Sequence, residues 1–351
     1  MRLNVSSGKK ENSMKKQIAL VFGSVNSEHD ISVASAASVY EYFPHDVYDC
    51  VLLYIAKDGT FNVGDYTLDD MYNNDLKNHR PLYLNFDYQN PGFVEQASGK
   101  AVSIDAAFLM LHGQMGEGGH VQGLLKCANI PFTGCDVLSS SLCMDKGFTH
   151  EVCEANGIPM AGYQLIYSLE DIDYSLIDYP VIVKPCREGS SFGVSIAHSK
   201  EELLKACEFA FGFDQRILIE EYIDGVEVGV SVLKTADEFI VSHADQVNVS
   251  GEIFDFQEKY HPHATETLPY ALFPEEITEK IRMYAKQAFE ILDCEQFARI
   301  DFFISKDHEV FFNEINTIPG FTVNSRYPSM IARMGTDYTS LITKLIEGAH
   351  S

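Results

Sequence analysis

Two short segments near the C-terminal end decide how this chain folds: residues 299–303 read Arg-Ile-Asp-Phe-Phe and residues 312–316 read Phe-Asn-Glu-Ile-Asn. Both alternate and are rich in Phe and Ile, as β-strands are. The stretch between them, residues 306–309, is polar, as a connecting loop is. The sequence therefore predicts an antiparallel hairpin closed by a loop of about four residues.

The predicted hairpin gathers charged and amide side chains on one face. A loop centred between residues 307 and 308 places Asp301 opposite Glu314 and Arg299 opposite Asn316, and alternation along a strand puts all four on the same side. Carboxylate and amide oxygens are the hard ligands that Mg²⁺ prefers, above all where substrate phosphates complete the shell. A guanidinium supplies a fixed charge for an oxyanion or a phosphate. The segment therefore predicts a metal site formed by Asp301, Glu314 and Asn316, with Arg299 beside it.

The alternative is a surface hairpin with an ordinary salt bridge. It is disfavoured because the second strand runs directly into Thr317-Ile318-Pro319-Gly320, a rigid turn that would hold the polar cluster in place.

Length and charge limit the possible functions. A chain of 351 residues is too long for one small core and indicates two or three domains. The formal net charge of −25 disfavours nucleic acid and anionic membranes as partners.

Cysteine usage and the N-terminal segment indicate a cytoplasmic protein. The eight cysteines are scattered without a CxxC pair or zinc spacing, which favours reduced thiols. The apolar run from Ile18 to Phe22 is too short for a signal peptide or a membrane span. Residues 1–13 are polar, and we expect them to lie outside the fold.

The N-terminal part is expected to form an open α/β domain with a parallel sheet. A buried strand at residues 18–22 precedes a Gly-Ser turn, a helix over 32–42 and a second strand over 51–55. The turn lacks the GxGxxG pattern of a dinucleotide site, so NAD is rejected. Residues 58–100 are polar and rich in Tyr and Asn, and we expect a variable excursion there.

The later segments predict smaller mixed units. One helix is expected over 138–156, and residues 160–220 are expected to hold short strands and a helix over 200–211. A long helix over 274–292 precedes the acidic hairpin, and a final helix begins at Thr339.

Two further segments are candidates for nucleotide binding. In residues 181–193 a strand ends in Lys184 and continues into a polar loop with Ser190 and Ser191, which can fold around phosphates, although a hairpin turn with a solvated lysine fits equally well. In residues 217–227 an apolar strand ends in acidic residues that can pair with a purine edge and a ribose. An acidic strand end without a ligand is the simpler interpretation of that segment alone.

Residues 254–260 lead into residues 261–270, which resemble a loop that closes over a site. They show no clear periodicity between two structured segments, as lids often do. His261 and His263 in this loop lack nearby third ligands, and we expect them to be solvated.

Taken in order, these segments resemble the D-alanine–D-alanine ligase family of ATP-grasp enzymes, from about Ile18 to Leu345. The most specific stretches are HGQMGEGGHVQG from residue 112, MDK at 144–146, VIVKPCREGSSFGV from 181, EKY at 258–260, RID at 299–301 and FNEINTIPGFTVNSRYP from 312. The resemblance implies a three-domain ATP-grasp fold of α/β and α+β units, with an N-terminal open α/β domain. Its expected boundaries are 14–134, 135–221 and 222–351.

The resemblance also implies roles for individual residues around ATP and two Mg²⁺ ions, with Mn²⁺ as an alternative ion. Lys146, Lys184 and Ser191 would bind ATP phosphates, Glu220, Glu221, Tyr222 and Ile223 the adenine, and Glu227 the ribose. Asp301, Glu314 and Asn316 would bind the metal ions. Glu28 would orient the first D-alanine, and Ser190 and Tyr260 would join it in a hydrogen-bonded triad. Lys259 would face the γ-phosphate, Arg299 would stabilise the tetrahedral intermediate, and His112 and Ser325 would contact substrate.

Two departures from the family pattern concern the glycine-rich turns. The chain has Gly23-Ser24 where the family usually has two glycines, and GEGG at 116–119 where GEDG is usual. Neither change removes a charge with an assigned role.

The segment Ser325-Arg326-Tyr327-Pro328 is similar to that of the vancomycin-resistance ligases, and Asp245 and Phe254 match positions that those enzymes share. The lactate-forming members carry His at position 260, where this chain keeps Tyr. An arginine beside the second pocket makes it more polar and suits a hydroxymethyl side chain better than a methyl. D-serine is therefore the expected second substrate, with D-alanine as the alternative.

Three other interpretations compete with this one. They are a plain D-alanine–D-alanine ligase, a different ATP-grasp carboxylate–amine ligase, and a non-catalytic nucleotide-binding protein. The HGQMGEGG and EKY segments disfavour the second, and the intact charged set of Lys184, Arg299, Asp301 and Glu314 disfavours the third. The resemblance further implies a homodimer, a role in cell-wall precursor synthesis, and no nucleic-acid or membrane partner.

Overall fold

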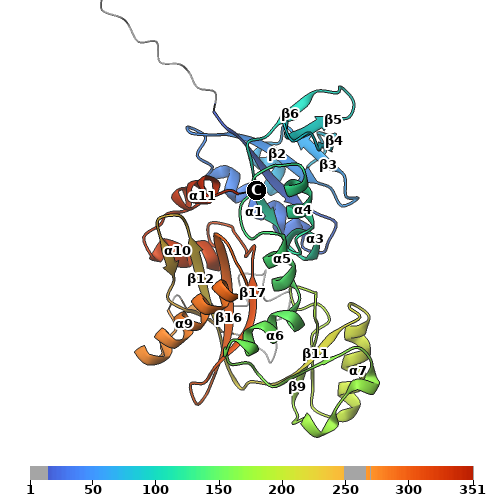
Figure 1. Ribbon diagram of the computed structural model, residues 1–351, viewed down its shortest axis with the longest axis vertical. Coiled ribbons are helices and arrows are strands. Elements are labelled where there is room, and N and C mark those ends of the chain that lie inside the picture. Colours follow the sequence, from blue (N-terminus) through green and yellow to red (C-terminus); the bar gives the residue numbers. More distant parts are fainter. Residues whose placement is uncertain (1–14, 249–265, 269, 351) are drawn as a thin grey trace, which may run out of the picture.

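The computed structural model describes residues 15–248, 266–268 and 270–350. Three separate β-sheets organise this part of the chain, as the expected three units require. Figure 1 shows them in succession along the long axis of the molecule, with the helices packed around and between them.

The first sheet has seven strands in the order β6-β5-β4-β3-β2-β1-β7. Strand β1, next to the edge strand β7, pairs in parallel with both β2 and β7, which confirms the predicted parallel core. The strands are β1 (Gln17–Gly23), β2 (Asp49–Ile55), β3 (Phe61–Gly64), β4 (His79–Asn85), β5 (Gly92–Glu95), β6 (Ala101–Ser103) and β7 (Ala106–Leu111).

The excursion expected over residues 58–100 is a structured part of the first sheet, inserted in the sequence between β2 and β7. This region forms the antiparallel strands β3, β4 and β5 and the short helix α2 (Leu68–Tyr72), which extend the first sheet. The strands are short, and β4 alternates between buried and exposed side chains, so their polar content reflects one solvated face.

The second sheet is antiparallel, in the order β10-β9-β11-β8. Its strands are β8 (Tyr163–Ile166), β9 (Val181–Pro185), β10 (Ser195–Ala197) and β11 (Ile217–Glu221), with short 3₁₀ turns at Leu169–Asp171 and Tyr174–Leu176. Helix α7 (Lys200–Phe211) begins at the N-cap Ser199 and buries Leu203, Ala206, Cys207 and Ala210 against the sheet. Its bounds are those predicted.

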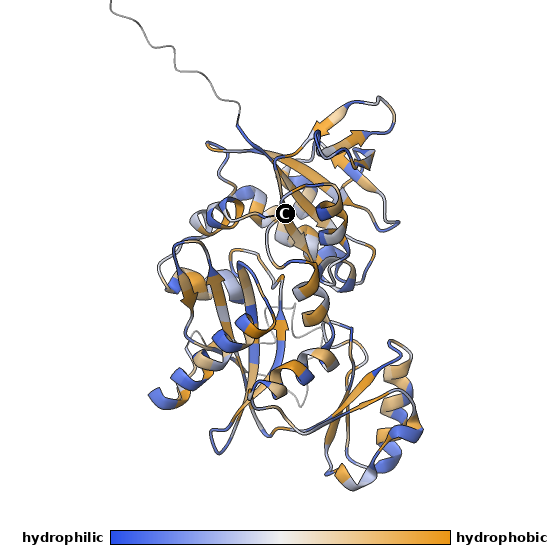
Figure 2. Ribbon diagram, in the orientation of Figure 1, coloured by the Kyte–Doolittle hydropathy of each residue, from blue (hydrophilic) through white to orange (hydrophobic). Residues whose placement is uncertain are grey.

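The third sheet carries the predicted hairpin. Its main order is β15-β14-β12-β16-β17, and β13 pairs with β12. The strands are β12 (Gly225–Lys234), β13 (Phe239–Val241), β14 (Asp245–Asn248), β15 (Glu266–Leu268), β16 (Phe297–Ser305) and β17 (Val310–Asn316). Helix α9 (Glu275–Ile291) buries Ile281, Ala285, Ala288 and Phe289, and Figure 2 shows hydrophilic and hydrophobic residues along the same helix.

The predicted helix over 138–156 is two helices, α5 (Val137–Met144) and α6 (Lys146–Ala155), separated by Asp145. Asp145 has an extended backbone (ψ 101°), and its carboxylate accepts a hydrogen bond from Phe148 N at 3.2 Å as the N-cap of α6. The break therefore starts a new helix at Lys146.

The units share residues in their cores. Phe321, Tyr327 and the apolar side of α11 (Tyr338–Glu347) belong to the same buried cluster as β1 and β7. Cys135, Cys143 and Cys153 pack with the third sheet instead. The C-terminal segment thus completes the N-terminal core, and the domain boundaries remain a proposal.

The remaining helices are α1 (His29–Glu41), α3 (Gln114–Glu117), α4 (His120–Cys127) and α10 (Arg326–Arg333). All eight cysteines are free thiols. No helix within the described residues has the length and apolar character needed to span a membrane.

Candidate active site

Two adjoining cavities lie where the three sheets meet. The first, about 810 Å³, is lined by the β1–α1 turn, the segment after β7 and the segment after β17. The second, about 490 Å³, is lined by strands of the second and third sheets. Lys146, Ser190, Glu227 and Glu314 line both cavities. These residues therefore mark the junction between two compartments of one site.

The predicted pairing across the hairpin is confirmed. Asp301 pairs with Glu314 and Arg299 with Asn316. The register shifts next to Asp301, because nearer the loop Phe302 pairs with Phe312 and leaves Asn313 as an extra residue in β17. A bulge of this kind redirects a side chain, and Asn313 Oδ1 lies 3.4 Å from Lys184 Nζ. The bulge thus links the strand of the predicted metal ligands to the predicted phosphate-binding lysine.

Asp301 is buried and held by three groups. Arg299 donates from Nε to Oδ1 (2.9 Å) and from Nη2 to Oδ2 (2.7 Å), and Asn316 Nδ2 donates to Oδ2 at 3.0 Å. Arg326 Nη2 lies 3.8 Å from Oδ1. The positive charge required beside two neighbouring carboxylates is therefore supplied by two arginines.

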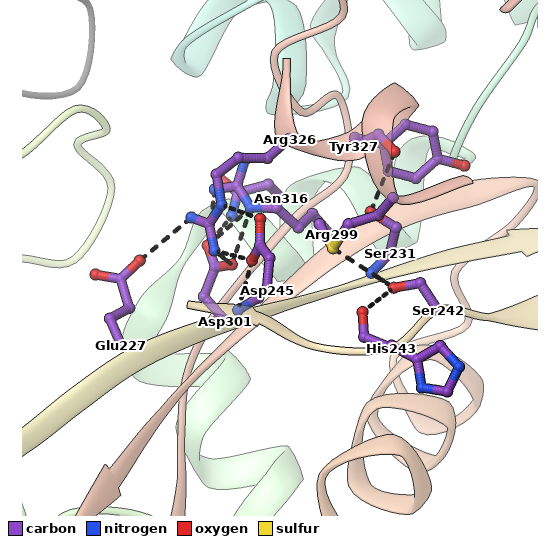
Figure 3. A network of polar contacts seen from close by, with 12 residues as sticks. Glu227, Ser231, Ser242, His243, Asp245, Arg299, Asp301, Asn316, Arg326 and Tyr327 are labelled. Carbon is purple, nitrogen blue, oxygen red and sulfur yellow. Dashed lines mark hydrogen bonds and ion pairs between the residues drawn. The ribbon is translucent and has the colours of Figure 1, made fainter. Parts of the chain in front are cut away.

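Arg326 joins three acidic residues from three strands, β12, β14 and β16 (Figure 3). It pairs with Asp245 through Nε–Oδ2 (2.9 Å) and Nη2–Oδ1 (2.7 Å), and its Nη1 lies 3.5 Å from Glu227 Oε1. Burial alone would lower the pKa of Arg326, but Asp245 and Asp301 outweigh it and raise the pKa above its usual value. Glu227, predicted at the ribose, lies at the junction of the two cavities and contacts this arginine.

The network needs a glycine at its centre. Gly229 in β12 pairs with Asp245 on one side and Asp301 on the other. A Cβ placed on Gly229 would lie 2.3 Å from Arg326 Nη2 and 2.8 Å from Asp301 Oδ1. The missing side chain at this position therefore makes room for the arginine.

The predicted metal ligands fit a divalent cation by their chemistry. Since Asn316 uses its Nδ2 on Asp301, its Oδ1 is left to serve as a hard ligand, and Glu314 lines both cavities. Asp301 keeps lone pairs beyond those used by Arg299 and Asn316. The described residues hold no group of three His, Cys, Asp or Glu side chains arranged for a metal. A cation here would therefore depend on the amide of Asn316 and on oxygens of a bound nucleotide.

The second cavity contains a buried ion pair. Lys184 Nζ lies 2.7 Å from Glu220 Oε2, and His150 Nε2 lies 2.8 Å from Glu220 Oε1. Burial alone would raise the pKa of Glu220, but Lys184 and His150 outweigh it and lower the pKa to about 2. Lys184 thus pairs with one carboxylate oxygen of Glu220, and His150 lies beside the other without the alignment of a hydrogen bond. Of the segment predicted to hold adenine, Glu221, Tyr222 and Ile223 also line this cavity.

His150 was missed by the sequence analysis. It lies on α6, four residues after Lys146, and this spacing places two side chains on the same side of a helix. Its ring packs edge-on against Tyr163 and Phe312, and its Nδ1 is buried without a hydrogen-bond partner. The signal that could have identified it is the Lys-x-x-x-His spacing that begins at the lysine of the MDK segment, Lys146.

Lys146 reaches the junction of the cavities. Its Nζ donates to Glu188 O at 2.6 Å and lies 3.8 Å from Glu314 Oε2. The start of its helix is fixed because the capping carboxylate of Asp145 is also paired with Arg216. The structure therefore places this predicted phosphate ligand beside a predicted metal ligand.

Glu28 and Ser190 meet as predicted, although they are far apart in sequence. Ser190 Oγ donates to Glu28 Oε1, and Ser190 and Ser191 both have positive φ angles (48° and 61°). Glu28 is buried at the start of α1. The third member of the predicted triad, Tyr260, lies outside the described residues, as do Lys259 and Phe254.

His112 and Glu117 complete the first cavity. His112 Nδ1 donates to Ile318 O at 3.0 Å, so its Nε2 accepts from Ser35 Oγ at 3.1 Å, and burial lowers the pKa of His112. Glu117 accepts from Gly113 N at 2.9 Å, and burial together with Glu28 raises the pKa of Glu117 to about 8. Glu117 was quoted within its motif but given no role. Its proximity to Glu28 and Glu314 could not be inferred from sequence spacing.

Ser325 lies in the first cavity as the N-cap of α10. Its Oγ accepts from Thr322 N at 3.0 Å and lies 2.8 Å from Thr322 Oγ1. A helix N-terminus favours a carboxylate, because unpaired N–H groups and the helix dipole point toward it. Arg326, the next residue, is held beside it by Asp245.

Comparisons with known proteins agree with this arrangement. Family models described as "D-ala D-ala ligase N-terminus" and "D-ala D-ala ligase C-terminus" match residues 17–135 and 152–347. The chain is 37% identical to a D-alanine–D-alanine ligase of Caldicellulosiruptor bescii (95% of this chain, 94% of that protein) and 35% identical to the vancomycin B-type resistance protein VanB of Enterococcus faecalis (95% and 98%). The crystal structure of the VanG D-Ala:D-Ser ligase of Enterococcus faecalis superposes with a TM-score of 0.86 at 34% identity (95% and 99%).

Proposed function

Because this chain belongs to the D-alanine–D-alanine ligase family, we propose that it joins D-alanine to D-serine at the expense of ATP. The observation that carries the choice of D-serine is the guanidinium of Arg326, fixed by Asp245 at the N-terminus of α10 beside Ser325. A hydroxymethyl side chain offers that polar group a partner, whereas a methyl leaves it facing an apolar atom.

The nucleotide would lie in the second cavity. Glu220 fixes the ammonium group of Lys184 in this cavity, and Lys146 supplies a second ammonium group at the junction of the two cavities. Ser190 and Ser191 supply hydroxyls and left-handed backbone that can wrap phosphate oxygens. ATP phosphates would therefore point toward Glu314, at the junction with the first cavity.

A divalent cation, Mg²⁺ or Mn²⁺, would be held by Asp301, Glu314 and Asn316. When bound, it would neutralise phosphate charge and polarise the phosphoryl group that is transferred. The number of ions is part of the proposal, and we expect two.

The first D-alanine would bind at Glu28, whose carboxylate attracts the substrate ammonium group. ATP would phosphorylate the carboxylate of this D-alanine, which is a poor electrophile, and convert it into an acyl phosphate. The amine of D-serine, oriented by the contact of its carboxylate with Ser325 and α10, then attacks that carbon and phosphate leaves. Arg299, fixed on Asp301, would stabilise the oxyanion that forms during the attack.

Water would hydrolyse the acyl phosphate, so the site must close during the reaction. The predicted lid with Lys259 and Tyr260 lies outside the described residues, and its role remains a prediction. A cytoplasmic location, a role in peptidoglycan precursor synthesis and a homodimeric state are also part of the proposal.

Product analysis tests the proposal directly. The protein is incubated with ATP, Mg²⁺ and D-alanine, then with D-alanine plus equal D-serine or D-lactate, and the products are identified chromatographically. We expect D-alanyl-D-serine to exceed D-alanyl-D-alanine. A larger yield of D-alanyl-D-alanine would favour the alternative, which the name of the Caldicellulosiruptor relative supports. No ligation of any D-amino acid would contradict both.

A further inference from the structure

Helix α1 carries three serines, Ser32, Ser35 and Ser38, at intervals of three residues, and all three are buried. This spacing places them along one side of the helix. Each hydroxyl has a different partner. Ser32 accepts from Gly23 N and donates to Met110 O within the first sheet, and Ser35 donates to His112. Ser32 and Ser35 therefore connect α1 to residues of the N-terminal sheet and to the residue that follows β7.

Ser38 makes its contacts with that C-terminal part. Its Oγ accepts from Val323 N at 2.9 Å and lies 3.4 Å from the hydroxyl oxygen of Tyr338. Tyr338, on α11, donates its one hydroxyl hydrogen to Phe321 O. Two side chains from opposite ends of the sequence thus fix two successive peptide groups of one loop.

The segment they hold is residues 317–325, which we call the second-substrate loop. It connects β17 to α10 and lines the first cavity with Thr317, Ile318, Thr322 and Ser325 among others. His112 holds its beginning through Ile318 O. Within the loop, Ser325 N donates to Thr322 O at 2.8 Å and Thr322 N donates to Ser325 Oγ at 3.0 Å.

This turn orients the serine hydroxyl. Ser325 Oγ accepts the N–H of Thr322 and lies 2.8 Å from Thr322 Oγ1, so its own hydrogen is left for a ligand carboxylate when the threonine hydroxyl is the donor in that contact. The direction of that hydrogen depends on where Thr322 lies, and Val323, the residue that Ser38 holds, directly follows Thr322.

We propose that Ser38 is a positioning residue for the second substrate: it fixes the second-substrate loop so that Ser325 meets the carboxylate of the incoming D-amino acid. This inference rests on the proposed ligase function. In the described structure Ser35 lines the first cavity, whereas Ser38 lies one turn further along α1 and acts through Val323.

The test compares two variants with one matched control. Ser38→Ala removes the acceptor of Val323 N, and Tyr338→Phe removes the hydroxyl that contacts Phe321 O and Ser38. Thr339→Val is the control, because Thr339 donates to Tyr42 O at 3.1 Å across the same contact between α11 and α1 and does not touch the loop. Kinetics are measured separately for ATP, the first D-alanine and the second substrate.

We expect Ser38→Ala and Tyr338→Phe to raise the KM of the second substrate by about fivefold to tenfold, as the loss of one buried hydrogen bond implies. The KM of ATP should change by less than about twofold, and Thr339→Val should match the wild type. Hydrogen exchange at the Val323 amide should become faster in Ser38→Ala.

Two kinetic results would overturn the proposal: an unchanged second-substrate KM in both variants, or an equal rise in all three KM values, which would indicate general destabilisation. The exchange measurement needs no turnover. If the wild type ligates no D-amino acid, the proposed function fails by itself. Unchanged exchange of Val323 in Ser38→Ala would then refute the anchoring role independently.

Discussion

Asp301 and Glu314 face each other across one hairpin, yet their surroundings differ. Asp301 is buried and bound to Arg299, Asn316 and Arg326, whereas Glu314 lines both cavities with Lys146 Nζ 3.8 Å away. One carboxylate is therefore part of the folded core, and the other is placed to act on ligands. A substitution at each should have a different signature.

Glu314→Gln should lower turnover at least about a hundredfold while it shifts the thermal midpoint by no more than about 2 °C, because it removes a ligand charge without leaving a buried charge unpaired. Asp301→Asn should lower both, since a partner lost from a buried ion pair destabilises by about 3–5 kcal/mol. Steady-state kinetics and thermal unfolding of both variants check this. Equal stability losses would contradict the distinction.

Replacement of Arg326 should change the choice of second substrate. Arg326→Leu leaves Asp245 buried without its partner, so we expect a loss of several degrees in thermal midpoint. Arg326→Leu with Asp245→Asn removes both charges and should recover most of that loss. The double variant should then favour D-alanine over D-serine, as a competition assay with equal substrates would show. A retained preference for D-serine in the stable double variant would refute the role of the guanidinium.

Glu117 predicts a pH effect on stability. Its pKa is raised from 4.5 to about 8 by burial and by Glu28, so between these values the folded chain keeps a proton that the unfolded chain has released. Stability from this residue therefore falls as the pH rises from about 4.5 to about 8 and is constant above. Without nucleotide or divalent ions, Glu117→Gln should gain thermal midpoint relative to the wild type across that window. Glu151→Gln on the exposed side of α6 is the control, and a pH-independent difference would contradict this prediction.

At the scale of elements, strand β12 lies between β14 and β16. It has Gly229 at the position where those two strands carry Asp245 and Asp301, and this leaves room for Arg326. Gly229→Ala would place a methyl 2.3 Å from Arg326 and 2.8 Å from Asp301. We expect a loss of about 2 kcal/mol or more in unfolding free energy and a large loss of activity, because the network must move. Gly123→Ala on α4, with its nearest atom at 3.9 Å, is the control and should be neutral or slightly stabilising. An active, stable Gly229→Ala variant would show that the network can shift without loss.

Much of this arrangement was predictable from local patterns. Strand β11 and helix α7 have the predicted bounds, and the hairpin pairing follows from alternation and loop length. The pairing near the loop was offset by one residue, because the bulge at Asn313 leaves no trace in the pattern of the strand. The break at Asp145 was missed because a capping carboxylate ends one helix and starts another within a single stretch of helix-forming sequence.

Contacts between distant segments were beyond local reasoning. The Ser190–Glu28 contact was expected from a family resemblance, not from spacing, since the two residues are 162 positions apart. The pairing of Arg326 with Asp245 depends on how β14 and α10 approach β12, and the pairing of His150 with Glu220 on how α6 lies against β11. Such contacts arise from packing, which the sequence specifies only through the whole fold.

At the scale of the molecule, the three cores differ in size, and the smallest belongs to the second sheet. Its buried cluster contains eleven residues from β8 to β11 and α7, and it is separate from the other two clusters. A small core opens more often, because it buries less apolar surface. We therefore expect amides of β9, β11 and α7 to exchange faster than those of β1, β7 and β16 in the protein without ligand.

ATP with Mg²⁺ should slow exchange in the second sheet more than in the first, because Lys184 and Glu220 line the nucleotide cavity and a ligand stabilises the form it binds. Hydrogen-exchange mass spectrometry checks both statements, with ADP as a comparison. Equal protection of all three sheets would show that the molecule opens as a single unit.

The packing of α11 against β1 and β7 has a consequence for synthesis on the ribosome. Phe321, Tyr338, Leu341 and Leu345 fill the same interior as the first strand made, and His350 exchanges backbone hydrogen bonds with Phe132. While the residues from about Phe321 onward are still inside the ribosome, that interior stays open to water. The first sheet is thus completed only after α11 has been made, and a stop codon between β17 and α11 would leave its interior exposed.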